Sequence, residues 1–482
     1  MRTLRATRPL AGILAAISAA SVLLIAAPVA GPGAASAAAT APATLVVGPS
    51  TAASAALAHS AAVVAATATA IVPGSVNRTS IAISATYDAS IYLGYLNRHL
   101  GGRVTIVATN RSGAGIDRVE LNTVMGPLGG LVLGTSTVDG RTVRPARSDQ
   151  TIIVPLGGVL PDAATATIVV RFSATLRTST AGSSWLFARA NGIADLYRWL
   201  PWVSRRTPFA RPNFGDPFVT PVSPHVHVVI RSDVPLRYAT TGKLTSRSAD
   251  QLIAGFDASD VRDFIVTASR DTASRQATVG STVIRVVARS GFPAAAVLTA
   301  AKASFAKLQA LLGPYPYPLL TLSESAGGYG MEGPNTVWLP HSMASANLRY
   351  LVTHEMTHQW FYGLVGNDQA REPFADEAMT DMVARYVLGM RRSSACSTAR
   401  LDLAIYRYSA GCYYEDVYIQ GGNLLDDARR AMGTTRFFTA IRGYITAHKL
   451  GIVHTRTLLD ALDAATTLDL RARWLARFPS LY

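Results

Sequence analysis

Two histidines and a downstream glutamate constrain this chain more than any other feature. Residues 354–358 read His-Glu-Met-Thr-His, and eighteen residues separate His358 from Glu377. Residues four apart on a helix share one face, so His354 and His358 point both imidazoles at one place. Two imidazoles and one carboxylate are typical ligands of catalytic zinc, which keeps its fourth position for water. Glu355 can reach that water without binding the metal. The pattern predicts one zinc ion per chain and a hydrolytic site.

The residues after the second histidine carry a resemblance to a known family. Residues 358–368 read His-Gln-Trp-Phe-Tyr-Gly-Leu-Val-Gly-Asn-Asp, and residues 372–377 read Glu-Pro-Phe-Ala-Asp-Glu. With the zinc motif, these runs resemble the M1 metallopeptidases, the gluzincin aminopeptidases, whose third ligand is a Glu at this spacing. Thermolysin-like enzymes carry the same ligands at a different spacing. The resemblance implies that His354, His358 and Glu377 bind zinc and that Glu355 is the general base.

Two shorter elements on either side of the zinc motif extend this resemblance. Residues 328–334, Gly-Tyr-Gly-Met-Glu-Gly-Pro, are similar to the family's Gly-x-Met-Glu segment, which lines the substrate cleft. The resemblance assigns substrate binding to Gly330, Met331 and Glu332, with the Glu on the free amino group of the substrate. Tyr418 and the three residues after it are similar to the family's Tyr-x-x-Gly, whose Tyr donates a hydrogen bond to the tetrahedral intermediate. The implied function is zinc-dependent hydrolysis of the N-terminal peptide bond of peptides.

The spacing of apolar residues predicts two structural parts after the first 78 residues. Residues 79–268 contain alternating runs separated by Gly, Asn, Asp and Pro, which is typical of strands. Within residues 269–482 the spacing becomes helical after Phe292, and helices are expected at about 295–312, 347–362, 373–388, 422–432 and 434–448. The expected fold class is α+β, with an N-terminal antiparallel β-rich domain followed by a thermolysin-like, mainly helical zinc-peptidase domain. The resemblance is to a short form that lacks the family's C-terminal helical domain.

The first 78 residues predict export from a bacterial cell. Three Arg within the first eight residues precede an uncharged run over 9–30, and residues 35–37 read Ala-Ser-Ala, a signal-peptidase site. This predicts a signal peptide over 1–37, an Ala/Thr-rich linker over 38–78, and a protein that is secreted or associated with the cell envelope. The uncharged run is also long enough to span a bilayer, so a retained anchor is the alternative.

Cysteine usage agrees with export. Cys396 and Cys412 are the two cysteines of the chain, sixteen positions apart. In an oxidising compartment such a pair is most simply a disulfide. Closing a loop of this size stabilises a fold by roughly 3 kcal/mol in the chain-entropy picture. The bond would restrain the segment that leads to Tyr418.

The net charge of +15 raises the question of an anionic partner. The basic residues are scattered, and no basic helix or finger motif is present, so nucleic acid is not an expected partner. Attraction to an anionic cell wall or membrane surface is the simpler explanation. Peptide substrates are the expected partners of the zinc site.

Several polar residues have more than one interpretation. Asp381 lies one turn beyond Glu377, where it either accepts a hydrogen bond from a ligand histidine or is a solvated helix residue. His225 and His227 alternate on one expected strand, and without a third ligand nearby they are expected to be ordinary strand residues.

The substrate's amino group leaves another question open. Many M1 enzymes supply a second polar anchor for it from the β domain, and the matching region here offers only Asn191 or Asp195. A zinc endopeptidase with an open cleft is therefore an alternative. A zinc-stabilised, non-catalytic cell-wall binding protein is a further one, although such a protein would usually lose the base or the tyrosine, and this chain keeps Glu355 and Tyr418.

Overall fold

Alternating burial along the first strands produces a large, mainly antiparallel sheet. The computed structural model describes residues 70–211 and 213–482 of the chain. In β1 (Ile83–Gly94) every second side chain is buried, as expected for a strand with one face on a core. β1 pairs with β2 (His99–Asn110) in antiparallel and with β13 (Val226–Ser232) in parallel orientation.

The remaining strands of this part complete three sheets. They are β3 (Ile116–Asn122), β4 (Val132–Leu133), β5 (Ser136–Val138), β6 (Arg141–Val143), β7 (Ala146–Ser148), β8 (Thr151–Leu160), β9 (Thr165–Thr175), β10 (Phe187–Ala190), β11 (Ile193–Leu196), β12 (Trp202–Val203), β14 (Arg237–Thr240), β15 (Lys243–Arg247), β16 (Ile253–Ala258) and β17 (Val266–Ser269). The large sheet has the order β15-β16-β13-β1-β2-β9-β5-β6, with β4 also beside β9. The two smaller sheets are β12-β3-β8-β7 and β10-β11-β17-β14. Short helices α2 (Met125–Gly129) and η2 (Ser184–Leu186) lie between strands.

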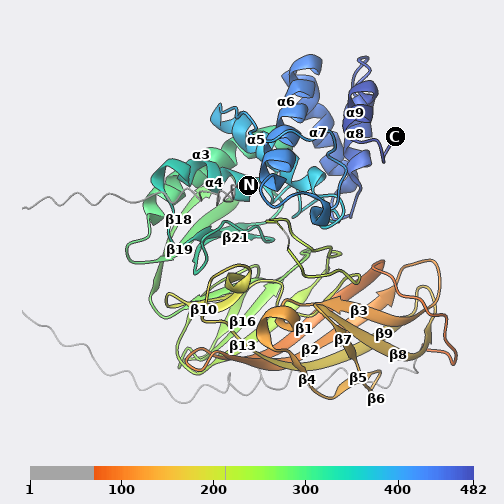
Figure 1. Ribbon diagram of the computed structural model, residues 1–482. Coiled ribbons are helices and arrows are strands. Elements are labelled where there is room, and N and C mark those ends of the chain that lie inside the picture. The colour runs from red at the N-terminus through yellow and green to blue at the C-terminus, as the bar shows by residue number, and fades with distance from the viewer. Residues whose placement is uncertain (1–69, 212) are drawn as a thin grey trace, which may run out of the picture. The chain divides into compact units, whose positions relative to one another are not determined.

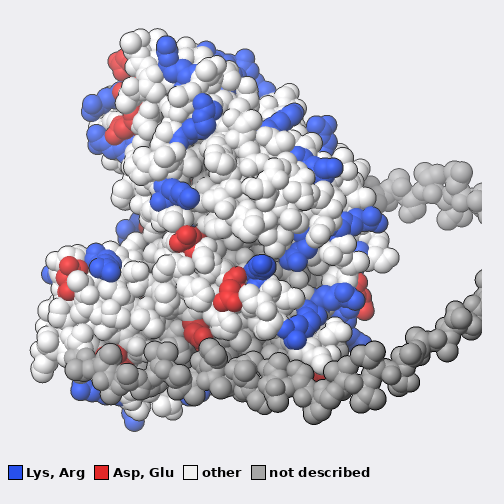
Figure 2. All heavy atoms as spheres, turned by 180° about the vertical axis from the view of Figure 1, so that it is seen from behind, with Lys and Arg blue, Asp and Glu red and all other residues white. Residues whose placement is uncertain are grey.

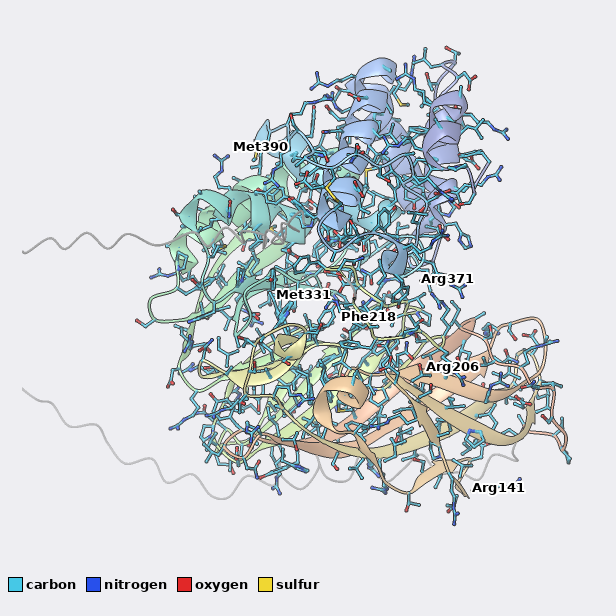
Figure 3. All side chains as sticks on the ribbon, viewed as in Figure 1. Arg141, Arg206, Phe218, Met331, Arg371 and Met390 are labelled. Atoms are coloured by element: carbon cyan, nitrogen blue, oxygen red, sulfur yellow. A yellow bond between two sulfur atoms is a disulfide. The ribbon has the colours of Figure 1, made fainter. Side chains whose placement is uncertain are left out.

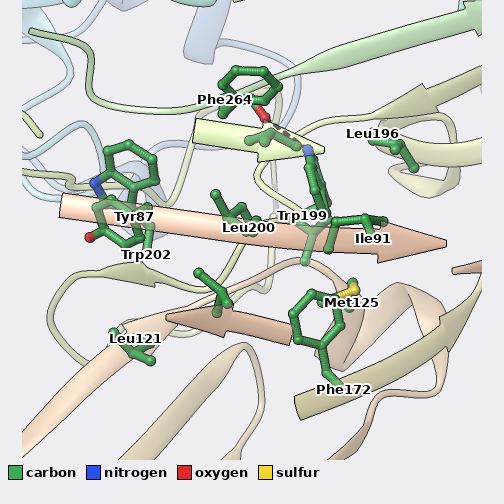
Figure 4. Packing of buried hydrophobic residues seen from close by; sticks show 14 of the residues in the cluster. Tyr87, Ile91, Leu121, Met125, Phe172, Leu196, Trp199, Leu200, Trp202 and Phe264 are labelled. Carbon is green, nitrogen blue, oxygen red and sulfur yellow. Dashed lines mark hydrogen bonds between the residues drawn. The ribbon is translucent and has the colours of Figure 1, made fainter. Parts of the chain in front are cut away.

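Aromatic side chains form the centre of the core of this β-rich part (Figure 4). Trp199 is fully buried, and its indole N–H donates a hydrogen bond to the carbonyl of Phe264 at 2.7 Å. Tyr87 stacks on Trp202 with ring centroids 4.1 Å apart, and its hydroxyl accepts a hydrogen bond from the backbone N–H of Val203 at 3.0 Å. The polar atoms of Trp199 and Tyr87 therefore keep hydrogen-bond partners although their rings are buried.

A fourth sheet, covered by helices, follows the β-rich part (Figure 1). Its strands are β18 (Thr272–Val279), β19 (Thr282–Arg289), β20 (Leu319–Ser325) and β21 (Thr336–Pro340), paired in this order. The helices are α3 (Ala294–Leu312), α4 (Ser345–Thr357), α5 (Met379–Leu388), α6 (Gly421–Met432), α7 (Thr434–His448), α8 (Thr455–Ala464) and α9 (Arg471–Arg477). Helices α3 and α4 contact this sheet, and α5 to α9 lie beyond them.

Helix α3 joins strands β19 and β20 of the fourth sheet and buries one apolar stripe. Its buried residues recur at helical spacing and are Val297, Ala301, Ser304, Phe305, Leu308 and Leu312. The helix ends at Gly313, whose φ of 100° favours glycine. Within the described ranges, α3 is the one helix long and apolar enough to be considered as a membrane span. It packs on α4, β18 and β19, as the core helix of a folded domain does.

The fold class expected from the sequence is confirmed, since a β-rich part precedes a mainly helical one. The boundary at residue 268 stays a prediction. The expected helix over 347–362 is shorter, because the chain leaves helical geometry after Thr357 and turns at Tyr362, whose φ is 90°. Helices α8 and α9 and strands β18 and β19 were not predicted individually.

The N-terminal edge of the folded body lies inside the predicted linker. Val72 pairs with Val159, and the carboxylate of Asp117 accepts hydrogen bonds from the Ser75 hydroxyl and from the backbone N–H groups of residues 76–78. These bonds outweigh burial and lower the pKa of Asp117 to about 2. The predicted signal peptide and residues 38–69 of the linker lie outside the described residues.

Basic side chains are spread over the surface. On the face in Figure 2, Lys and Arg side chains occur over both the β-rich and the helical part, and acidic side chains are fewer. They form no continuous stripe on that face, which agrees with the scatter of basic residues along the sequence.

Candidate active site

Three side chains converge where α4 ends and the π-helix η3 (Phe374–Ala378) begins. His354 lies in the last turn of α4, His358 lies directly after it, and η3 carries Glu377. The Nε2 atoms of the two histidines are 3.3 Å apart, and they lie 3.5 Å and 3.4 Å from Oε2 of Glu377. A tetrahedral zinc ion with bonds of about 2.05 Å separates its ligand atoms by about 3.3 Å. The triangle therefore fits zinc, and the donor set is the predicted one.

A buried atom without a hydrogen bond supports the same fit. Oε2 of the buried Glu377 makes no hydrogen bond of acceptable geometry among the described residues, and its ion-pair contacts there are the two imidazoles at 3.4 Å and 3.5 Å. A buried carboxylate oxygen is costly unless a cation or a donor compensates its charge. A metal ion at the centre of the triangle supplies that charge.

The surroundings shift the pKa values of the three groups in different directions. Burial lowers the pKa of His354, which favours the neutral imidazole that a metal requires. Burial acts in the same direction on His358, but Asp376 and Glu377 outweigh it and raise its pKa. Burial opposes ionisation of Glu377, yet His358 and His354 outweigh it and lower its pKa. His358 must therefore release a proton when a metal binds, so acidification weakens metal binding.

Asp376 holds His358 in place, a role that the sequence analysis did not assign. Its Oδ1 lies 2.7 Å from Nδ1 of His358, which leaves Nε2 directed at the metal position. Gln369 donates through Nε2 both to Oδ2 of Asp376 at 2.8 Å and to Oε1 of Glu332 at 3.0 Å. One amide thus joins the support of the metal ligands to the predicted amine anchor. The available signal was the position of Asp376 directly before Glu377.

Asp381 is buried, and its hydrogen-bond and ion-pair partners are Tyr350 and Arg385. It is fully buried, which contradicts a solvated helix residue. Its carboxylate accepts a hydrogen bond from the Tyr350 hydroxyl at 2.5 Å and pairs with Arg385 at 2.6 Å, and the described residues show no hydrogen bond from it to a histidine. The carboxylate is directed to Tyr350 and Arg385 because Arg385 lies one helical turn further on α5. Asp381 therefore supports the cleft wall through Tyr350, which lies one turn before His354.

Glu355 lies between the metal ligands and the segment that contains Gly330. A Cβ atom at Gly330 would come within 2.1 Å of Oε1 of Glu355, so only glycine leaves room for this carboxylate. Burial raises the pKa of Glu355 well above its usual value, against the opposing effect of His358. A carboxylate with a raised pKa is suited to accept a proton near neutral pH.

Glu332 lies close to the same centre. Ligand atoms of Glu332, Glu355 and His358 all lie within 4.8 Å of one another. Burial raises the pKa of Glu332 to about 7, because Asp376 and Glu377 offset the lowering effect of His358. A positive group beside Glu332 would restore its charge.

Tyr418 faces the metal ligands from the π-helix η5 (Tyr414–Gln420). Its ring is nearly parallel to that of His354, with centroids 5.7 Å apart. Burial and the charge of Glu377 raise the pKa of Tyr418, so its hydroxyl stays protonated and can donate a hydrogen bond. The structure joins Cys396 to Cys412, with Cα atoms 5.8 Å apart, and Gln420 of η5 donates to the Cys396 carbonyl at 2.8 Å. The disulfide loop therefore braces the helix that carries Tyr418.

These side chains lie in a cleft of about 620 Å³. Met331, on its wall, lies where the β-rich part meets the helical part (Figure 3). The lining residues are Gly182, Ser183, Trp185, Arg211, Asn213, Phe214, Asp216, Tyr329, Gly330, Met331, Glu332, Tyr350, Leu351, His354, Glu355, His358, Glu377, Ala410, Tyr414 and Tyr418. All the predicted ligands, the base, the tyrosine and the Gly330–Glu332 segment meet in this one cleft.

The expected second anchor lies elsewhere. Asp195 is buried in the β-rich part, where Thr267, Ser325 and the backbone N–H of Ala326 donate to it. Asn191 donates to a backbone carbonyl, and neither residue lines the cleft. The carboxylate that the β-rich part does supply to the cleft is Asp216. The sequence analysis missed it because it lies in an irregular segment after β12.

The two strand histidines behave as expected. His225 and His227 both contact the carboxylate of Asp257 on the neighbouring strand, at 3.3 Å and 2.8 Å. Within residues 70–211 and 213–482, the groups of side chains able to hold a metal are two, His354 with His358 and Glu377, and Glu332 with Glu355 and His358.

Two histidines at the end of one helix and a glutamate from the next therefore form the predicted ligand triangle beside a small sheet. No protein-family model and no curated protein matches the chain. Among solved structures, the M1 zinc metallopeptidase from Deinococcus radiodurans matches with a TM-score of 0.65 and 16% identity, over 85% of this chain and 96% of that one. A variant described as a two-domain M1 zinc metallopeptidase bound to L-tryptophan gives 0.64 and 16%, over 85% and 97%. Another, bound to a Tyr-Ser-Ala substrate, gives 0.63 and 16%, over 85% and 96%.

These matches cover both parts of the described structure and nearly the whole length of the matched chains. The chain therefore has the two-part fold of the M1 zinc metallopeptidases, and the resemblance inferred from the motifs is confirmed for the fold.

Proposed function

We propose that this protein is a zinc-dependent aminopeptidase that hydrolyses the first peptide bond of peptides. The observation that carries the proposal is the distance between the predicted amine anchor and the reacting groups. Ligand atoms of Glu332, Glu355 and His358 lie within 4.8 Å of one another. An ammonium group held by Glu332 therefore places the first peptide bond, rather than a later one, beside Glu355.

Each cleft residue has a defined task in this proposal. His354, His358 and Glu377 hold one zinc ion, which when bound polarises the scissile carbonyl and lowers the pKa of the attacking water. Glu355 accepts the proton of that water and passes it to the leaving amine. Tyr418 donates a hydrogen bond to the oxyanion that develops on the former carbonyl oxygen.

Two carboxylates recognise the substrate's amino group. Glu332 supplies one, and Asp216 supplies a second from the β-rich part, for which the sequence offered only Asn191 or Asp195. Oδ1 of Asp216 pairs with Arg211 at 2.6 Å, and its other oxygen has no hydrogen bond within the described part of the chain. A charge-assisted hydrogen bond to an ammonium is worth about 1.5–3 kcal/mol. The matched structure bound to Tyr-Ser-Ala supports peptides as the substrate class.

The decisive experiment compares one peptide with and without an N-terminal acetyl group. Acetylation removes the ammonium charge, so wild-type hydrolysis should fall at least about tenfold, because 1.4 kcal/mol corresponds to a factor of ten. The Glu332→Ala variant should lose most of this preference. Equal cleavage of the capped and free peptides by the wild type would falsify the aminopeptidase proposal and favour the endopeptidase alternative. No cleavage of either peptide by a zinc-loaded protein would favour the non-catalytic alternative.

We also propose that the protein works outside the cytoplasm, secreted or at an anionic envelope surface. The N-terminal signal pattern, the Cys396–Cys412 bond and the net charge of +15 support this location. Sequencing the N-terminus of the protein from culture medium and from the membrane fraction distinguishes a cleaved signal from a retained anchor.

A further inference from the structure

Two solvent-exposed aromatic rings lie on the cleft wall. Phe214 and Tyr329 are 58% and 51% exposed, and their ring centroids are 5.5 Å apart. Among the large aromatic side chains of the described residues, only Tyr92 is similarly exposed, and it does not line the cleft. Contiguous apolar surface that remains in water commonly marks a ligand-binding groove. The exposed surface of these two rings contributes no burial to the folded core, so it is free to bind a ligand.

Trp185 packs behind Tyr329, on the buried side of the aromatic pair. Its ring is buried and lies 6.1 Å from Tyr329 and 6.1 Å from Trp338, centroid to centroid. A Cβ atom at Gly327 would come within 2.5 Å of the Trp185 ring, so glycine is needed for the ring to take this place. The three rings come from three separate segments, which indicates that the fold constructs this wall.

The aromatic pair lines the same cleft as the two carboxylates that we assign to the substrate's amino group. Phe214 is two residues from Asp216, and Tyr329 is three residues from Glu332. The ammonium and the first side chain of a peptide are bonded to the same carbon. A side chain that leaves that carbon therefore starts close to the two carboxylates, in the cleft that Phe214 and Tyr329 also line.

Arg211 also lines the cleft, but it is not available to bind an acidic first side chain of the substrate. Its guanidinium already donates to the carbonyls of Gly215 and Phe214 and to the Asp216 carboxylate. It has no need of an acidic substrate side chain as a further partner. The free surface beside the amine anchor is thus aromatic rather than cationic.

We propose that Phe214 and Tyr329, backed by Trp185, bind the first side chain of the substrate and select large apolar, above all aromatic, N-terminal residues. This inference rests on the proposed function and names its substrate class. Aromatic rings pair with one another in offset and edge-to-face arrangements, and both exposed rings are available for such a contact.

The test uses Phe-Ala-Ala, Ala-Ala-Ala and Ala-Phe-Ala with the zinc-loaded protein. We expect kcat/KM for Phe-Ala-Ala to exceed that for Ala-Ala-Ala by at least about tenfold, the discrimination that an apolar pocket provides. The Phe214→Ala and Tyr329→Ala variants should each reduce this ratio several-fold, and Tyr329→Phe should retain it. Tyr92→Ala, an exposed aromatic on β1, is the matched control and should change neither rate. Equal rates for Phe-Ala-Ala and Ala-Ala-Ala, or a preference that follows Ala-Phe-Ala, would overturn the proposal.

A binding measurement separates this inference from the proposed function. L-Phenylalaninamide and L-alaninamide are titrated into the same proteins by calorimetry, which requires no turnover. At least tenfold tighter binding of the phenylalanine amide, reduced by Phe214→Ala and Tyr329→Ala, supports the aromatic site even if no peptide is cleaved. Equal affinities contradict it even if all three peptides are cleaved.

Discussion

The two walls of the cleft are built in different ways. The metal-binding wall comes from one stretch of chain, residues 354–377, in which helix α4 places His354 and His358 and the next helix, η3, adds Glu377. The opposite wall combines residues 211–216 with residues 329–332, which are distant in the sequence. The first wall is encoded locally, whereas the second exists only when the β-rich part and the helical part are folded together.

The contacts that hold the two walls differ accordingly. Helix α4 packs on α3, α5 and β21, so the metal ligands rest on a continuous apolar core. The opposite wall is held by contacts between loops. Asn213 donates a hydrogen bond to the Ile405 carbonyl inside the disulfide loop, and Tyr406 donates to the Pro208 carbonyl at 2.7 Å. Substitutions in the metal-binding wall should therefore affect chemistry and metal affinity, and those in the opposite wall should affect substrate recognition.

The largest effect is expected from Glu355→Gln on the metal-binding wall. The change is nearly isosteric and removes the base without removing a ligand, so turnover should fall by about a thousandfold or more while zinc stays bound. Kinetics with a free-amine peptide and metal analysis of the same preparation measure both quantities. Glu377→Ala is the contrasting variant and should lose zinc, because one of three protein ligands is missing. Loss of zinc from Glu355→Gln would show that Glu355 is a ligand.

The contrast between the two walls also explains what the sequence could predict. His354, Glu355 and His358 were predicted because a helical period fixes their relative positions, and Glu377 was predicted from its spacing in the family that the motifs resemble. Tyr418 was found through its likeness to a family motif.

The roles of residues whose contacts depend on tertiary structure were not predicted. Asp381 has suitable helical spacing, but Tyr350 and Arg385 engage it, and Asp376, from η3, holds His358 instead. The sequence offered Asn191 or Asp195 as the second polar anchor. The fold instead brings Asp216 to the cleft from an irregular segment, which has no periodic pattern that could predict its position.

An intermediate effect is expected from Asp376→Asn. The variant keeps the size of the side chain but loses the negative charge that favours the correct orientation and proton position on His358, so zinc affinity should fall by about ten- to a hundredfold. Competition with a chelator measures the affinity. Asp257→Asn, which alters a similar carboxylate–histidine contact on the outer strands, is the control and should leave zinc affinity unchanged. An unchanged affinity in Asp376→Asn would mean that His358 is oriented by packing alone.

The smallest effect is expected from pH, which should change the affinity for substrate through Glu332 and Asp216 on the opposite wall. Burial raises the pKa values of Glu332 and Asp216 to about 7 each, above the usual carboxyl range, so both groups hold a proton below that pH. Only the ionised form attracts an ammonium. Affinity for a free-amine peptide should therefore be lost as the pH falls through about 7, by up to about tenfold per unit for one group.

The Glu355→Gln variant allows this loss to be measured as binding, since it cleaves too slowly to consume the peptide and Glu355 no longer titrates. Calorimetry between about pH 5.5 and 7.5 stays below the usual pKa of the substrate's own α-amino group, which is about 7.7–8.0. The N-acetylated peptide lacks the ammonium, so its affinity should not show this dependence. If free and capped peptides lost affinity in parallel, zinc release from the protonated His358 would be the cause, and the pH dependence would belong to the metal-binding wall instead.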